Sequence, residues 1–327
     1  MTKINQLLKF TPILKEKIWG GEKLISLLNK ESDKKNIGES WEISDVEADV
    51  SIVSEGVFKG ESLKDLIAKY KSDLVGDKVY KQFGEKFPLL IKFIDAKEAL
   101  SIQLHPSDNL LKGVTSFGKT EMWYVTQADK DAEIIIGFKK DSNKSEYLEN
   151  LSNKTLLDIL NIDKVKKADV YFVPPGRVHA IGAGTLIAEI QQTSDITYRV
   201  YDWDRKDIDG NFRELHTEKA LDAIDFTSQK TYKTDYKKVD NSTVEIVDCP
   251  FFTTNIISLK QESQYFVNHS NKDSFVIYMC VEGCAEISIS NQKKSLEIGE
   301  TLLVPASVKN LEITSKEKTE LLEVYIK

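Results

Sequence analysis

The chain carries only four histidines, and two of them stand in short polar motifs whose residue types suit metal binding. One motif is the segment Leu100–Pro106, in which Ser101, Gln103 and His105 alternate with apolar residues. Because the side chains of a β-strand point alternately to its two faces, this spacing places the three polar groups on one face. Buried polar groups need partners, so such a face is unusual if its only purpose is packing.

A lone acid and a second histidine lie in two later motifs. Glu121 opens an apolar run that continues through Trp123, and His179 follows a turn-forming Pro-Pro-Gly sequence. Two imidazoles, one carboxylate and the amide oxygen of Gln103 form a donor set that suits zinc and leaves positions open for water or substrate. Other divalent metals accept the same donors, so zinc is a preference. The alternative is structural, with His105 capping a turn and His179 hydrogen-bonded in the core.

The other two histidines, His216 and His269, are expected at the surface. His216 stands beside a predicted helix start, and His269 lies in the polar segment between Asn268 and Asp273. For both residues the sequence favours a surface position over a functional role.

Short runs of β-branched and aromatic residues, separated by turns, must position the polar motifs. Runs of this length and spacing predict an antiparallel sandwich or barrel, so the fold class is mainly β. The predicted strands lie within residues 87–94, 99–104, 123–126, 133–138, 169–173, 185–191, 251–259, 274–280, 285–289 and 301–304.

Three segments interrupt the strands with helical spacing of their apolar residues. Residues 62–83 place Leu63, Leu66 and Ile67 on one helical face, residues 145–162 repeat the pattern less regularly, and a short helix is predicted within 216–224. These helices are expected to pack on the outside of the β core and to close one end of it.

A comparison of the chain with itself indicates two related barrels. The spacing from Pro174 through Gly176 to His179 recurs from Pro305 through Ser307 to Asn310, and each copy follows a strand-like run. In the second copy an asparagine replaces the histidine. With the polar segment 230–240 as a linker, the predicted domains are a metal-binding barrel with helical insertions at 1–229 and a barrel without metal ligands at 230–327.

Composition excludes several classes of function. A net charge of −7 argues against a general nucleic-acid binder, although a phosphate pocket needs only a few local cations. No apolar run approaches the roughly 18–20 residues that span a bilayer, and the first twelve residues lack the apolar core of a signal peptide. Three cysteines suit neither a disulfide framework nor a zinc quartet. We therefore expect a cytoplasmic protein with no membrane or nucleic-acid partner.

Taken in order along the chain, these motifs closely resemble the type I phosphomannose isomerases, in particular the short bacterial form with a reduced helical insertion. The resemblance covers about two-thirds of the chain. It rests on the segments Lys17–Gly21, Gly38–Ser44, Pro88–Lys92, Leu100–Pro106, Lys119–Trp123, Pro174–His179 and Gln191–Trp203.

The resemblance implies a fold, a reaction and a cofactor. The fold is two cupin (jelly-roll) β-barrels with a small helical insertion. The reaction is the interconversion of mannose 6-phosphate and fructose 6-phosphate through a cis-enediol, assisted by one zinc ion per chain. The implied metal ligands are Gln103, His105, Glu121 and His179.

The resemblance also implies roles for pocket residues. Ser101 and Lys119 correspond to groups that hold the phosphate, and Arg199 to the arginine over the reacting end of the sugar. Glu189, Asp195 or a metal-bound water remain alternative proton carriers. Further positions that fall in the substrate pocket are Lys92, Trp19 and Glu39.

Each assignment has a structural alternative. Lys119 is otherwise a solvated loop charge, Arg199 pairs with Asp202 or Asp204, and Trp19 packs at the barrel rim. Three rival functions remain open at this point: an iron- or manganese-dependent cupin oxygenase, a non-catalytic sugar-phosphate sensor, and an isomerase of another hexose 6-phosphate.

Overall fold

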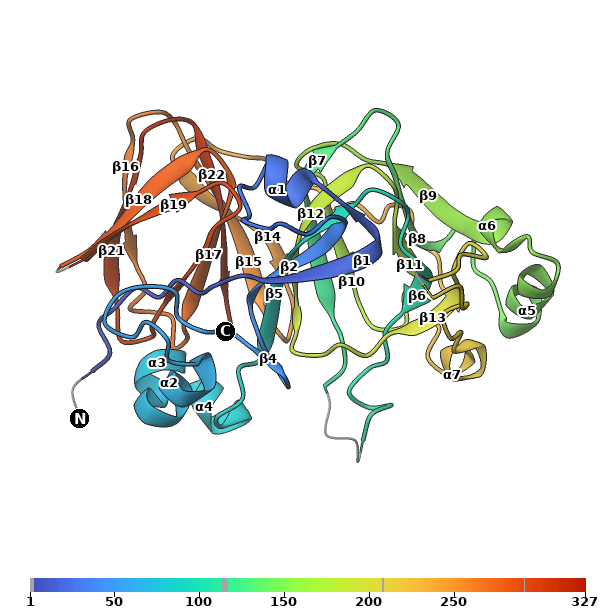
Figure 1. Cartoon of the computed structure of the whole chain (residues 1–327), viewed down its shortest axis with the longest axis horizontal. Coiled ribbons are helices and arrows are strands. Elements are labelled where there is room, and N and C mark those ends of the chain that lie inside the picture. The colour runs from blue at the N-terminus through green and yellow to red at the C-terminus, as the bar shows by residue number, and fades with distance from the viewer. Residues whose placement is uncertain (1–2, 113–116, 208, 291) are drawn as a thin grey trace.

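Antiparallel strands build two barrels that lie side by side (Figure 1), in a computed structural model that describes residues 3–112, 117–207, 209–290 and 292–327. The first barrel pairs a six-stranded with a five-stranded sheet. The larger sheet contains, in spatial order, β1 (Ile13–Gly21), β2 (Ile37–Ile43), β5 (Leu89–Ala96), β12 (Thr185–Gln192), β7 (Glu121–Ala128) and β10 (Val170–Val173). The smaller contains β13 (Tyr198–Tyr201), β6 (Ile102–Leu104), β11 (His179–Ile181), β8 (Glu133–Phe138) and β9 (Leu160–Lys164).

The second barrel, drawn in orange and red in Figure 1, repeats this plan with fewer strands. Its larger sheet contains β14 (Ser242–Asp248), β15 (Thr253–Leu259), β22 (Thr319–Tyr325), β17 (Val276–Glu282) and β20 (Thr301–Val304). Its smaller sheet contains β16 (Gln264–Asn268), β21 (Asn310–Ser315), β18 (Cys284–Ile289) and β19 (Gln292–Glu297). A small hairpin of β3 (Asp45–Val46) and β4 (Asp49–Val50) stands apart. Each predicted strand segment overlaps one of these strands, and the mainly β class is confirmed.

The repeated proline motif marks equivalent positions in the two barrels. β10 ends at Val173 and β11 begins at His179, just as β20 ends at Val304 and β21 begins at Asn310. Val173 pairs with Glu121, and Val304 pairs with Val276. The second barrel therefore carries valine and asparagine where the first carries glutamate and histidine. Over the described part of the chain, the one cluster of His, Cys, Asp and Glu suited to a metal lies in the first barrel.

The predicted helix at 62–83 forms as three short helices, α2 (Leu63–Tyr70), α3 (Ser72–Val75) and α4 (Asp77–Phe83). Lys71 and Gly76 interrupt it with φ angles of 50° and 97°. The helices lie against the second barrel (Figure 1), where the Val75 carbonyl accepts a hydrogen bond from Phe275 N at 3.2 Å. They thus cover the barrel that is farther away in sequence.

The remaining helices are α1 (Lys23–Ser26), α5 (Lys144–Ser152), α6 (Leu156–Ile159) and α7 (Thr217–Leu221). The predicted helix at 145–162 therefore ends early, because its last residues form β9. Phe138 and Ile135 of β8 pair with Leu160 and Ile162, so strand pairing overrides the helical spacing there. Among the described residues no helix is both long and apolar enough to span a membrane.

The segment 230–240 is packed against the first barrel rather than extended as a free linker. Tyr232 is 6% exposed, and its hydroxyl donates a hydrogen bond to the Phe138 carbonyl at 3.0 Å. Further along, the Lys238 ammonium pairs with Glu320 of the second barrel at 2.5 Å. The domain boundary at residues 229 and 230 stays a prediction.

His269 is buried, and the expectation of a surface position was wrong. Its side chain is 1% exposed, and Nε2 lies 3.0 Å from the Tyr278 hydroxyl. Tyr278 in turn donates to Glu323 at 3.1 Å, and Lys272 pairs with the same carboxylate at 2.7 Å. The local polar sequence concealed this burial, because β17 and β22 supply the covering groups from other parts of the chain.

Candidate active site

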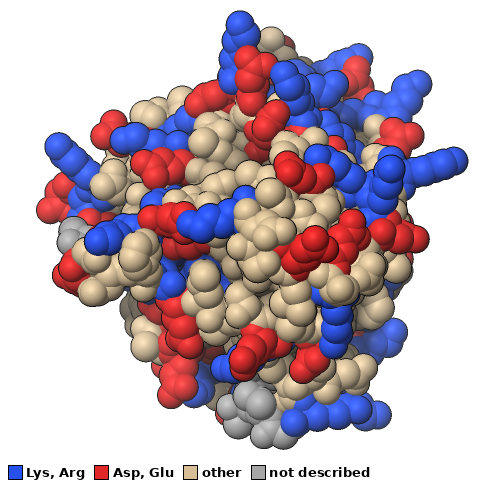
Figure 2. Space-filling model, turned by 90° about the vertical axis from the view of Figure 1, so that its right-hand side faces the viewer, with Lys and Arg blue, Asp and Glu red and all other residues tan. Residues whose placement is uncertain are grey.

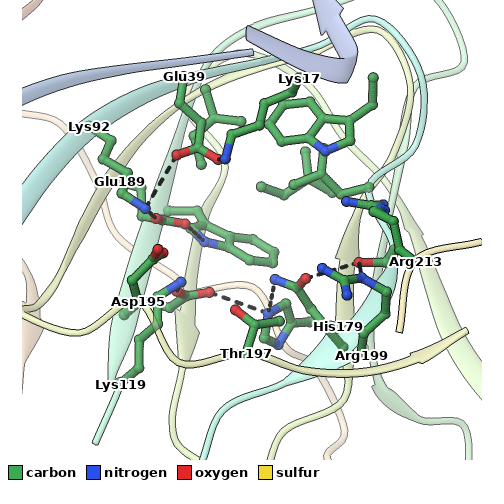
Figure 3. A pocket seen from close by; sticks show the side chains of 18 residues that line it. Lys17, Glu39, Lys92, Lys119, His179, Glu189, Asp195, Thr197, Arg199 and Arg213 are labelled. Carbon is green, nitrogen blue, oxygen red and sulfur yellow. Dashed lines mark hydrogen bonds and ion pairs between the residues drawn. The ribbon is translucent and has the colours of Figure 1, made fainter. Parts of the chain in front are cut away.

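A cavity of about 270 Å³ lies in the first barrel and is lined by side chains from both of its sheets (Figure 3). The sequence predicted twelve site residues, and eleven of them line this cavity. The twelfth, His105, contacts the lining residue Glu121. The lining residues that were predicted are Trp19, Glu39, Lys92, Ser101, Gln103, Lys119, Glu121, His179, Glu189, Asp195 and Arg199.

His105, Glu121 and His179 form a buried cluster that can hold a metal ion. One donor atom from each lies within 4.8 Å of the others. The carboxylate stands between the rings, with 3.5 Å from His105 Nε2 to Glu121 Oε2 and 3.5 Å from His179 Nε2 to Glu121 Oε1. Each of the three side chains is 1% exposed. The three residues come from the end of β6, the start of β7 and the start of β11, so strand pairing brings distant motifs together.

Backbone carbonyls orient the two imidazoles. His105 Nδ1 donates to the Ile196 carbonyl at 2.9 Å, and His179 Nδ1 donates to the Arg177 carbonyl at 2.8 Å. This tautomer leaves the Nε2 lone pairs directed at the cluster, as in metal-binding histidines. The buried atom His105 Nε2 has no hydrogen-bond partner, and Glu121 Oε2 is contacted by the Lys119 ammonium at 3.1 Å. Such an orphaned buried acceptor fits a bound cation.

Burial keeps both imidazoles neutral, the form that binds a metal. Loss of solvent and the nearby Lys119 charge hold the pKa of His105 well below its usual value. Burial lowers the pKa of His179 to about 4, despite its hydrogen bond to the Arg177 carbonyl. Neither ring needs to lose a proton to accept a metal ion at neutral pH.

Gln103 lies on the same strand face as Ser101, as the alternation predicted. Its amide oxygen accepts a hydrogen bond from Ser101 Oγ at 3.1 Å, and its amide nitrogen is 3.5 Å from His179 Nε2. Rotation of the amide by half a turn exchanges these two atoms and brings the oxygen toward the cluster. On the opposite face, Ile102 and Leu104 pack in the core. Leu100, by contrast, lines the cavity.

Lysines and carboxylates alternate along one wall of the cavity (Figure 3). Lys17 lies 3.1 Å from Glu39, and Lys92 lies 3.6 Å from Glu39 and 3.5 Å from Glu189. Burial opposes ionisation of Glu39, but Lys92 and Lys17 together lower its pKa to about 2. Glu189 differs because burial and the nearby Glu121 charge raise its pKa. A carboxyl group with a raised pKa in a cavity is suited to proton transfer.

Lys119 is 5% exposed, which rules out a solvated loop charge. Its ammonium lies 3.1 Å from Glu121, and although burial favours the neutral amine, the charges of Glu121, Glu189 and Asp195 raise its pKa. It therefore remains a cation beside the histidine cluster.

Arg199 lies across the cavity from this wall (Figure 3) and has a set of contacts that excludes the structural alternative. Its Nε donates to Ser101 Oγ at 3.3 Å. Asp202 instead binds Arg205 at 2.8 Å and Arg213 at 2.5 Å, and Asp204 pairs with Lys154. Arg199 is thus available to a ligand, with no carboxylate of the described residues within ion-pair distance.

Three polar lining residues escaped prediction: Lys17, Thr197 and Arg213. Lys17 stands two residues before Trp19 in a motif that was recognised, and Arg213 is one of only four arginines in the chain. Thr197 has no signal of its own. Local spacing could have nominated the first two, but only the folded chain brings them to the cavity.

Comparisons with known proteins agree with this arrangement. Residues 7–147 match the family model of the phosphomannose isomerase type I catalytic domain, and residues 242–326 match that of the mannose-6-phosphate isomerase cupin domain. A protein of Streptococcus mutans named mannose-6-phosphate isomerase is 34% identical over 297 residues, which are 90% of this chain and 91% of that protein. ManA of Bacillus subtilis, with the same name, is 32% identical over 90% of this chain and 92% of its own length.

Solved structures give the same result. The mannose 6-phosphate isomerase of Bacillus subtilis superposes with a TM-score of 0.84 at 30% identity, covering 98% of this chain and 100% of that one. The apo enzyme of Salmonella typhimurium shares the fold, with a TM-score of 0.77 at 17% identity over 99% of this chain and 100% of that one. With a cluster that can hold a metal ion inside the first of two cupin barrels, and relatives of over 30% identity along nine-tenths of its length, the chain belongs to the type I phosphomannose isomerase family and is an isomerase.

Proposed function

We propose that this chain interconverts mannose 6-phosphate and fructose 6-phosphate by moving a proton between C1 and C2 through a cis-enediol. One observation carries the proposal. The cavity joins a buried His-Glu-His cluster with an orphaned imidazole nitrogen to a carboxyl group of raised pKa and to Arg199, which has no carboxylate partner among the described residues. Aldose–ketose isomerisation needs a proton carrier, a group that stabilises the developing oxyanion and an ordered substrate.

We propose one Zn²⁺ per chain as the cofactor, held by His105, Glu121, His179 and the rotated amide of Gln103. Neutral imidazoles and a carboxylate suit zinc, and the orphaned imidazole nitrogen of the cluster supports a bound cation. When bound, the ion supplies Lewis-acid polarisation of a substrate oxygen.

Glu189 is the proposed proton carrier. Trp123 Nε1 donates to Glu189 Oε2 at 3.0 Å, while Glu189 Oε1 has no hydrogen-bond partner and faces Lys92 at 3.5 Å. One carboxylate oxygen is thereby anchored and the other is left for the substrate. Asp195 is the alternative carrier, because it lines the same cavity from a more exposed position.

The remaining polar residues orient the substrate. Arg199 donates charge-assisted hydrogen bonds to the enediolate, and Ser101 and Lys119 hold the phosphate, so that binding of a non-reacting group orients the substrate. Trp19 and Glu39 complete the sugar pocket.

The first test is a coupled isomerase assay with mannose 6-phosphate, run before chelation, after chelation and after zinc is added back. We expect activity to disappear on chelation and to return with zinc. Folded, zinc-loaded protein that binds mannose 6-phosphate without turnover would instead indicate a sensor. Turnover of another hexose 6-phosphate, with none of mannose 6-phosphate, would make that other sugar the substrate.

We also propose a cytoplasmic location with no nucleic-acid or membrane partner. All three cysteines are free thiols, which suits a reducing compartment. Charged side chains of both signs are interspersed over the face shown in Figure 2, and that face carries no broad basic surface of the kind that binds nucleic acid.

A further inference from the structure

His216 contacts the backbone of Arg199 at two points. The Arg199 N–H donates to His216 Nδ1 at 3.2 Å, and the His216 N–H donates to the Arg199 carbonyl at 2.7 Å. Arg199 lies on β13, an edge strand of its sheet. The outward backbone groups of an edge strand have no strand partner, so His216 occupies the place where a further strand would pair.

The neighbouring residue holds the side chain of the same arginine. The guanidinium Nη1 of Arg199 donates to the Glu214 carbonyl at 2.9 Å. Arg213, at the start of this segment, is fixed by Asp202, since its Nε donates to that carboxylate at 2.7 Å. Glu214 and His216 therefore hold both the guanidinium and the backbone of Arg199, and Arg213 anchors them to Asp202. We name Arg213, Glu214 and His216 the arginine clamp.

His216 departs from the usual chemistry of its position. It is the N-cap of α7, where its carbonyl accepts from Ala220 N at 2.9 Å. N-cap side chains are typically Ser, Thr, Asp or Asn, whose oxygens bind the first turn of the helix. The imidazole of His216 makes no such bond and reaches back to Arg199 instead. A residue that breaks a local preference in favour of a contact with a cavity-lining residue points to a functional constraint.

We infer that His216 is a positioning residue for Arg199, and that the arginine clamp aims the guanidinium at the reacting end of the substrate. The inference rests on the proposed function, in which Arg199 stabilises the enediolate. Loss of the imidazole leaves the Arg199 N–H without its acceptor and loosens the edge of β13, so the guanidinium loses its fixed direction. An effect confined to the transition state lowers kcat more than it raises KM.

The test combines variants of the two residues. Arg199→Ala is expected to lower kcat by at least about 100-fold with zinc retained, the typical effect of one oxyanion donor. His216→Ala should lower kcat about tenfold, the effect of one lost hydrogen bond. His216→Asn, whose amide oxygen can accept the same N–H, should recover most of that loss. Leu215→Ala, at an exposed side chain that lies beside the clamp residues and makes no hydrogen bond to Arg199, serves as the matched control and should behave as wild type.

The double variant separates positioning from general stability. In the Arg199→Ala background, His216→Ala should change kcat by less than about twofold, because residues that act as a unit are not additive. A full tenfold loss in that background, or wild-type kcat in His216→Ala alone, overturns the inference.

Amide hydrogen exchange distinguishes failure of this inference from failure of the proposed function. If wild-type protein does not turn over mannose 6-phosphate, the enzymatic proposal fails, but the clamp still predicts faster exchange of the Arg199 amide in His216→Ala than in Leu215→Ala. Equal exchange in the two variants refutes the clamp whatever the activity.

Discussion

At the scale of single residues, the balance between burial and nearby charges sets the ionisation of the groups in the site. Burial keeps His105 and His179 neutral, whereas nearby lysines keep Glu39 ionised with a pKa of about 2. Glu189 has both influences, and its pKa is raised because burial and Glu121 outweigh Lys119 and Lys92. Groups of one chemical type thus acquire different roles from their surroundings.

The proton-transfer role is tested by Glu189→Gln, which keeps the shape of the side chain. We expect kcat to fall by about 10²–10⁴-fold, the usual contribution of general acid–base catalysis. Zinc content should not change, and exchange of the C2 hydrogen with solvent deuterium should be lost in parallel. Asp195→Asn is the matched variant in the same cavity; if it abolishes exchange while Glu189→Gln does not, Asp195 is the proton carrier.

At the scale of elements, a turn with an unusual backbone angle lets helices of the first half of the chain pack against the second barrel. Gly76 joins α3 to α4 with a φ of 97°, and a Cβ placed there would lie 2.3 Å from the Asp273 carbonyl oxygen. Asp273 also accepts from the N–H of Asp77 at 2.8 Å, at the start of α4. The glycine permits this close approach between an insertion of the first half of the chain and a loop of the second barrel.

Two glycines with similar backbone angles separate strain from packing. Gly60 has a φ of 88°, and a Cβ there would meet no atom within 4 Å. We expect Gly60→Ala to cost about 1 kcal/mol in unfolding free energy from backbone strain alone. Gly76→Ala should cost at least about 3 kcal/mol, because steric overlap adds to the strain. If urea denaturation shows equal losses of unfolding free energy in the two variants, the close approach to Asp273 does not contribute to the cost of Gly76→Ala.

At the scale of the whole molecule, the barrels share an apolar core. One cluster of buried side chains contains residues of both, and Phe87 packs on Phe275 with ring centroids 4.6 Å apart. The N-terminal segment adds a bridge between Leu8 and Leu303 of β20. A continuous core of this kind favours cooperative unfolding of the two barrels.

Substitution in the second barrel should therefore destabilise the first. Phe275→Ala is expected to lower the unfolding free energy by about 3–5 kcal/mol. All four tryptophans precede residue 230, so their fluorescence reports on the first barrel. In urea denaturation of Phe275→Ala, the unfolding midpoint seen by tryptophan fluorescence should shift as far as the midpoint seen by circular dichroism. Phe266→Ala, at a side chain that is 75% exposed, is the control and should shift neither. An unchanged fluorescence midpoint in Phe275→Ala would mean that the barrels unfold independently.

Sequence alone determined the features that follow from local periodicity. Alternation through Ser101, Gln103 and His105 identified one polar strand face, and short β-branched runs located the strands. The spacing shared by Pro174 and Pro305 revealed the repeated barrel. These properties depend on residues a few positions apart, where backbone geometry relates position to direction.

Only the tertiary structure decided which distant residues meet. Lys17 and Arg213 reach the cavity, His216 holds Arg199, and His269 is buried, and local patterns place none of these side chains. Each depends on contacts between segments separated in sequence, which form only when the sheets close into barrels. Burial and charge pairing are properties of that packed arrangement, so short-range patterns do not contain them.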